Sequence, residues 1–174
     1  MRQTKKITLS AMIVALSAAF MALGGLVEVL DLSVLALTSL LVAFVYIEIG
    51  SPYTWLVWLC SSLAAFLLVP GSVVWGEYLT IFGIYPILKA YIEKLRRGIW
   101  LPLKLLYINA VLWGLFFAFE FLFDYPIFIY DKLWLKIAVY LIANVAFVAY
   151  DLFLTVLIRA YFAKFRNRIK HLLK

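Results

Sequence analysis

Long apolar runs, separated by short polar or turn-forming segments, dominate the sequence. The runs are continuously apolar and do not alternate between apolar and polar residues, which favours helices over the strands of a barrel. About 20 such residues span a hydrocarbon core as a helix, with a range of roughly 17–25. The runs are Ile7–Val27, Leu32–Ile49, Tyr53–Val69, Val73–Ile92, Leu103–Phe123 and Leu133–Ile158. The pattern therefore predicts an all-α integral membrane protein, a bundle of six transmembrane helices.

The breaks between the runs are short and consist of residues that end helices. Gly50 and Pro52 separate the second run from the third, and Pro70 with Gly71 follows the third. No segment is long enough to link separate domains, so we expect residues 1–174 to form a single transmembrane domain. Pro86 interrupts the fourth run and predicts a kink, which either opens a cavity or only fits the helix to its neighbours.

Composition agrees with lipid as the solvent of this chain. Hydrophobic residues make up 67% and charged residues 14% of the 174 residues. A soluble domain has about 45–50% apolar and roughly 25% charged residues, and a small one keeps much of its surface in water. We expect a multi-pass protein of a cell membrane, with the bacterial plasma membrane as the location.

The positions of lysine and arginine predict how the chain is oriented. With the N-terminus inside, 14 of the 16 basic residues fall in inner segments, and only Lys132 and Lys136 fall outside. Six of the nine acidic residues fall outside. Inner loops of membrane proteins carry the excess of positive charge, so both termini are predicted to be cytoplasmic. The net charge of +7 is explained by this asymmetry, and no nucleic-acid partner is expected.

A stripe of small residues runs along the first predicted helix. Ala11, Ala15 and Ala19 recur every four residues, just over one helical turn, and share one face. Small residues let membrane helices approach closely, and packing then replaces the missing hydrophobic driving force. The stripe predicts either a docking face for a partner protein or packing inside the bundle.

Polar and aromatic residues share faces of the fifth and sixth predicted helices. Trp113 and Glu120 lie on one face with Asn109, and Tyr140 and Asn144 lie on one face of the last helix. Asn144 is near the midplane, where a polar side chain facing lipid would lack partners. Two uses of Asn144 remain open: contact with a ligand, or a hydrogen bond to a neighbouring helix.

The fourth helix adds Tyr78 on its aromatic face, with Glu77 at its outer end. Aromatic rings with a few amides and carboxylates suit a flat heterocyclic molecule, through stacking and directed hydrogen bonds. Asp151 lies near the inner end of the last helix, so we expect it to pair with an inner lysine or arginine. The candidate substrate-binding residues are Glu77, Tyr78, Trp113, Glu120, Tyr140 and Asn144.

Several classes of chemistry lack their residues in this sequence. There is no GxxxxGK[ST] motif for ATP hydrolysis and no HExxH or GxSxG motif. His171, the only histidine, lies in the basic tail, and Cys60 is the only cysteine. We therefore expect no catalytic residues, no metal site, no cofactor and no enzymatic activity.

The layout resembles that of the S components of energy-coupling-factor transporters, which are small proteins of six apolar spans with both ends inside. In that family an alanine-rich AxxxA pattern in the first helix meets the transmembrane coupling subunit, and the stretch from Ala11 to Ala15 fits it, repeated from Ala15 to Ala19. The resemblance implies a subunit that captures a small vitamin-like molecule from outside. It also implies partners that energise transport, namely the coupling subunit and its ATPases.

Two alternative functions remain for a chain of this size and layout. One is a structural membrane scaffold, such as a rod-shape-determining protein of the MreD type. The other, less favoured, is a membrane enzyme that acts on lipid. A pocket lined by Trp113, Glu120 and Asn144 would favour the binding subunit, and a filled core at that level would favour the scaffold.

Overall fold

The computed structural model describes residues 3–122 and 133–166. Every regular element in this part of the chain is a helix. Five helical stretches are long and apolar enough to cross a membrane. They are α1 (Gln3–Leu26), α2 (Asp31–Glu48), α3 (Ser51–Leu68), the part Arg97–Leu115 of α6 (Arg97–Leu122), and Ile137–Lys164, which joins α7 (Leu133–Ala160) to the π-helical segment η3 (Tyr161–Phe165). The predicted all-helical, multi-pass membrane protein is confirmed at this level.

The fourth apolar run forms an interrupted helix. It begins as α4 (Val74–Glu77), widens into the π-helical turn η2 (Tyr78–Phe82), and resumes as α5 (Tyr85–Ile92). Pro86 lies in the first turn of α5, where its missing N–H has no helical partner to lose. Proline therefore helps to begin a helix here, and the interruption lies before it. Because this run is not among the five long stretches, the sixth crossing remains a prediction.

Some predicted features lie outside the described residues. They are the end of the fifth run at residue 123, the outer residue Lys132, and the cytoplasmic C-terminal tail beyond residue 166. The described residues form two compact units, which are described separately. Unit 1 contains the described residues within Met1–Tyr91 and Val156–Lys174, and unit 2 contains those within Ile92–Thr155.

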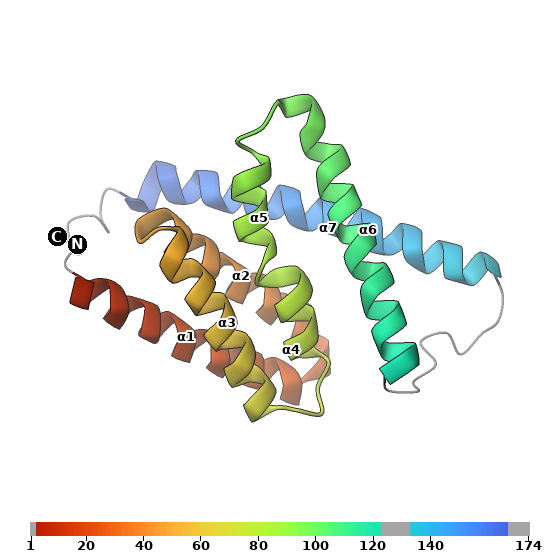
Figure 1. Ribbon diagram of the computed structural model, residues 1–174, viewed down its shortest axis with the longest axis horizontal. Coiled ribbons are helices and arrows are strands. Elements are labelled where there is room, and N and C mark those ends of the chain that lie inside the picture. The colour runs from red at the N-terminus through yellow and green to blue at the C-terminus, as the bar shows by residue number, and fades with distance from the viewer. Residues whose placement is uncertain (1–2, 123–132, 167–174) are drawn as a thin grey trace. The chain divides into compact units, whose positions relative to one another are not determined.

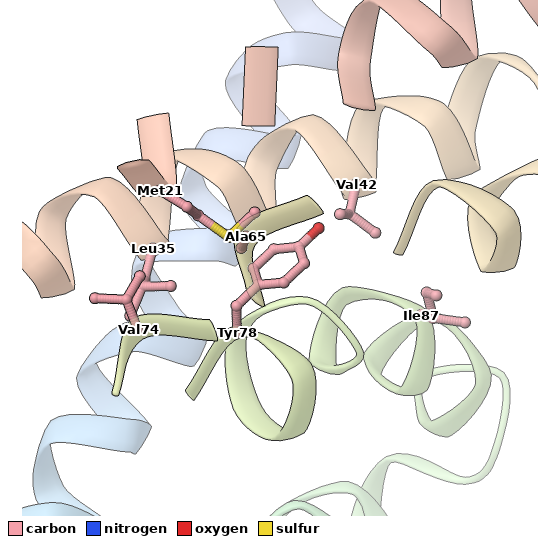
Figure 2. Packing of buried hydrophobic residues seen from close by; sticks show 7 residues of the cluster. All are labelled: Met21, Leu35, Val42, Ala65, Val74, Tyr78 and Ile87. Carbon is pink, nitrogen blue, oxygen red and sulfur yellow. The ribbon is translucent and has the colours of Figure 1, made fainter. Parts of the chain in front are cut away.

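In unit 1, α1, α2 and α3 pack side by side, with α4 and η2 against them (Figure 1). The reversal between α2 and α3 is made at Gly50, whose φ of 108° is readily adopted only by glycine, and Pro52 follows in the first turn of α3. One core cluster joins all these elements (Figure 2). Its buried residues are Met21, Leu35, Val42, Ala65, Val74, Tyr78 and Ile87.

The π-helical turn is held by a side chain from α3. The Trp58 indole N–H donates to the backbone oxygen of Leu79 at 3.1 Å, so a tertiary bond serves a carbonyl within the irregular turn. Gly83 follows the turn closely. A Cβ at this position would lie 2.6 Å from Cδ1 of Trp58 and 2.8 Å from the backbone oxygen of Tyr78. The turn therefore depends on close approach at Gly83 as well as on Trp58.

Glu48, the last residue of α2, contacts the C-terminal segment of unit 1. Its carboxylate accepts a hydrogen bond from the Tyr161 hydroxyl at 3.0 Å and lies 3.5 Å from Nε of Arg166. The Glu48 side chain is 7% exposed, so this residue is an enclosed partner of η3 and not the solvated interfacial charge that a helix-end position suggests.

Candidate functional site

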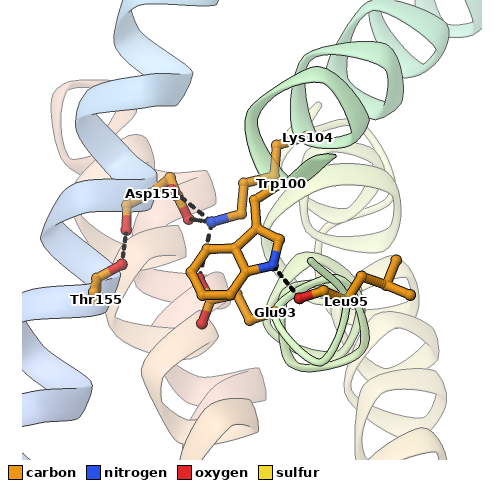
Figure 3. A network of polar contacts seen from close by, with 6 residues as sticks. All are labelled: Glu93, Leu95, Trp100, Lys104, Asp151 and Thr155. Atoms are coloured by element: carbon orange, nitrogen blue, oxygen red, sulfur yellow. Dashed lines mark hydrogen bonds and ion pairs between the residues drawn. The ribbon is translucent and has the colours of Figure 1, made fainter. Parts of the chain in front are cut away.

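A buried lysine connects three segments of unit 2. Lys104 lies two turns into α6, and its Nζ is 2.9 Å from Oε1 of Glu93 and 2.9 Å from Oδ2 of Asp151 on α7 (Figure 3). The Lys104 side chain is 7% exposed, against 30% for Glu93 and 15% for Asp151. The predicted pairing of Asp151 with a lysine or arginine is confirmed by its contact with Lys104.

Neighbouring groups orient this network. Nζ of Lys104 lies 5.9 Å from the centre of the Trp100 ring, within the range of a cation–π contact. The Trp100 indole N–H donates to the backbone oxygen of Leu95 at 2.9 Å, which fixes the ring beside the lysine. The arrangement holds opposite charges in contact and acts as an ion-pair anchor between α6 and α7.

An amide pair joins α6 and α7 at a second level. Asn144 Nδ2 donates to Oδ1 of Asn109 at 3.0 Å and to the backbone oxygen of Tyr140 at 2.9 Å. From Lys104 to Asn109 the position on α6 advances by five residues, while the partner on α7 moves back by seven, from Asp151 to Asn144. The two helices therefore run antiparallel past each other. Of the two uses considered for Asn144, the bond to a neighbouring helix describes this geometry.

The predicted aromatic residues of unit 2 lie one turn beyond the amide pair. Trp113 is 68% exposed on α6, and Tyr140 is 37% exposed on α7. Because the helices are antiparallel, these two residues lie on the same side of the Asn109–Asn144 pair. Glu120 lies further along α6 in the same direction. The Glu120 side chain is outside the described part. A role of these residues in binding remains a prediction.

The other two predicted residues belong to unit 1. Tyr78 begins η2 and is fully buried, and Glu77 ends α4 with a partly buried side chain. The six candidate positions thus divide into two in unit 1 and four in unit 2. The two groups are therefore two separate candidate binding sites.

The alanine stripe of α1 is exposed. Ala11, Ala15 and Ala19 all lie on the outer face of the helix. The opposite face carries Ser10, Ile13, Ser17, Ala18, Met21 and Gly24, which are buried in the packing of α1 with α2 and α3. Packing within unit 1 therefore does not use the stripe.

Lys104 and Glu93 are site residues that sequence reasoning did not single out as partners. The signal for Lys104 is a lysine enclosed by the apolar run after Pro102, where a charge requires a counter-charge. Which carboxylate supplies it depends on how the helices cross, and one chain sequence does not contain that information. Comparisons of the chain with protein-family models, curated proteins and solved structures find no match.

Proposed function

We propose that this protein is the substrate-binding subunit of an importer of the energy-coupling-factor type. It would capture a small, vitamin-like or heterocyclic molecule from outside a bacterial cell. Transport would be driven by a separate module, composed of a transmembrane coupling subunit and ATPases. The observation that carries the proposal is the exposed stripe of Ala11, Ala15 and Ala19 on α1.

The two faces of α1 differ in what they contact. Its buried face already packs against α2 and α3, so the exposed face is available to a further helix. On that face the alanines alternate with long apolar side chains, among them Met12, Leu16 and Leu23. Contact with lipid alone does not require small residues, whereas a second helix approaches most closely where side chains are small.

Co-purification tests the docking surface. The chain is co-expressed with the coupling subunit and ATPases of its host, and we expect the wild-type chain to purify with them. Ala15→Trp places a large ring in the stripe and should abolish co-purification. Leu67→Trp, at an exposed position on α3, is the matched control and should retain it. Equal recovery of both variants would reject docking through α1.

Mass spectrometry of the purified protein tests ligand capture, since a retained small molecule is expected. Trp113→Ala and Asn144→Ala should each weaken binding of that molecule roughly tenfold or more, because a stacking or hydrogen-bonding partner of the bound molecule is lost. Calorimetry with the identified molecule measures the change, and unchanged affinity in both variants would remove these residues from the binding site.

One observation favours the alternative of a structural scaffold. The amides of Asn109 and Asn144 pair with each other, which satisfies polar groups at that depth without a ligand. A chain that retains no small molecule and does not purify with a coupling subunit would support the scaffold.

A further inference from the structure

Four fully buried residues of unit 1 carry hydroxyl groups, and three of these residues lie at similar depth along their helices. The four are Ser17 of α1, Thr38 of α2, Ser61 of α3 and Tyr78 of η2. Ser17, Thr38 and Ser61 are seven to nine residues from the helix ends at Leu26, Asp31 and Leu68, or roughly 10–14 Å at 1.5 Å per residue. These four residues are called the hydroxyl layer.

The members of the hydroxyl layer differ in their hydrogen bonds. Thr38 donates to backbone oxygens of its own helix, at 3.1 Å to Val34 or 2.9 Å to Leu35. The Ser17 hydroxyl has no hydrogen-bond partner within the described part of the protein, whereas the hydroxyls of Ser61 and Tyr78 have only each other within reach, in a contact short of full hydrogen-bond geometry. Serine in a helix ordinarily returns its hydroxyl to a carbonyl one turn earlier, as Ser62 does to Trp58 at 2.8 Å. Ser17 and Ser61 do not.

The surroundings of Tyr78 define what can be bound. Its ring packs in the cluster with Met21, Val42 and Ala65, and its hydroxyl points away from η2 into that cluster (Figure 2). The Ser61 side chain lies beside this hydroxyl. Hydroxyls and apolar side chains supply no formal charge, and a charged group brought here would lose its hydration without a counter-charge. The bound group is therefore neutral.

We propose that Tyr78 and Ser61, with Ser17 at the same depth, bind a neutral hydrogen-bonding group inside unit 1, of the hydroxyl or carbonyl kind. Unpaired hydroxyls are unfavourable in an apolar interior, and a group that both donates and accepts hydrogen bonds satisfies them. The group belongs either to the polar end of a captured small molecule or to an internal water. The first source rests on the proposed function, whereas the second does not.

Thermal unfolding of the full-length protein in detergent tests the site, because the direction in which Tm changes shows whether a removed hydroxyl was hydrogen-bonded. Removing a hydroxyl that is hydrogen-bonded destabilises a protein, and removing one that is buried without a partner stabilises it. We therefore expect Tyr78→Phe and Ser61→Ala each to lower Tm by about 2–6 °C. Tyr53→Phe, in the other core cluster, is the matched control and should change Tm by less than about 2 °C.

Extraction of small molecules from the same preparations separates the two sources. A molecule retained by the wild-type protein and lost from Tyr78→Phe identifies the captured ligand as the source. A lower Tm in Tyr78→Phe, Ser61→Ala and Ser17→Ala alike, with no molecule retained by any of them, identifies internal water, because Ser17 takes no part in the direct contact between Ser61 and Tyr78. A lower Tm in Tyr78→Phe and Ser61→Ala but not in Ser17→Ala would show that these two hydroxyls bond only each other, and would overturn the proposal. A Tm that rises or stays the same in both Tyr78→Phe and Ser61→Ala would overturn the proposal.

Discussion

At Lys104 an ammonium group lies within 3.0 Å of carboxylates from two other segments, although the side chain is 7% exposed. Charges taken out of water are costly unless they are paired and hydrogen-bonded. The contacts to Glu93 and Asp151 meet that condition with short, charge-assisted bonds. Lys104 is therefore a residue whose removal leaves two carboxylates without their shared partner charge.

Replacing Lys104 tests this directly. Lys104→Met keeps most of the side-chain volume and removes the charge, so we expect the free energy of unfolding to fall by about 3–5 kcal/mol. Arg96→Met removes an exposed charge nearby and should change it by less than about 0.5 kcal/mol. Denaturant titration in detergent micelles measures both. Equal effects of the two variants would mean that the ion pairs contribute nothing specific.

The role of a residue was predictable from the sequence where it depended only on the position of that residue along a predicted transmembrane helix. The charge pattern predicts that Asp151 lies at an inner end rich in basic residues, so an ion pair was the expected outcome. Asn144 lies near the midplane, which requires a partner but does not say whether the partner is Asn109 or a ligand. The buried hydroxyls of Ser17 and Ser61 gave no signal, because serine is common on both faces of membrane helices.

Among the elements, the interrupted helix of α4, η2 and α5 differs most from its prediction. For α1, α2 and α3 the apolar runs gave bounds within a few residues of those observed, since the same residues that prefer lipid also form the helix. The π-helical turn was not predictable from Pro86. It depends on the indole of Trp58, which reaches Leu79 from a different helix.

Gly83 offers a test of that turn. In Gly83→Ala the new methyl group would meet Cδ1 of Trp58 at 2.6 Å and the Tyr78 backbone oxygen at 2.8 Å, so backbone must shift. We expect a loss of about 1–3 kcal/mol in the free energy of unfolding, as for other overpacked sites. Gly76→Ala, seven residues earlier, is the control, because no atom lies within 4 Å of its added Cβ. If both variants unfold alike, close approach at Gly83 is not what shapes the turn.

For the whole molecule, the interrupted helix decides the topology. The five long apolar stretches would leave the two termini on opposite sides of the membrane, and a crossing by α4, η2 and α5 would bring them to the same side. The charge asymmetry predicts the second arrangement, because it places 14 of 16 basic residues inside. If this segment does cross, apolar length alone would not recognise the crossing, since the helix is broken near its middle.

Cysteine labelling distinguishes the two topologies. In a Cys60→Ser background, Gly71→Cys and Gly98→Cys flank the interrupted helix, and neither added side chain meets an atom within 4 Å at its Cβ. We expect an impermeant maleimide to label position 71 on intact cells, and to label position 98 only after permeabilisation. Lys5→Cys should behave like position 98. Labelling of positions 71 and 98 from the same side would show that this segment does not cross.

The two residues that supply carboxylates to Lys104 are synthesised at different times. Glu93 precedes Lys104 by 11 residues, whereas Asp151 follows it by 47. As the ribosome extends the chain, Glu93 is present before the lysine, and Asp151 is added only when α7 emerges. A growing chain can thus neutralise this ammonium as α6 leaves the translocon, and the later arrival of Asp151 then fixes α7 against α6. The order of the three residues along the chain therefore suits the order in which the helices enter the bilayer.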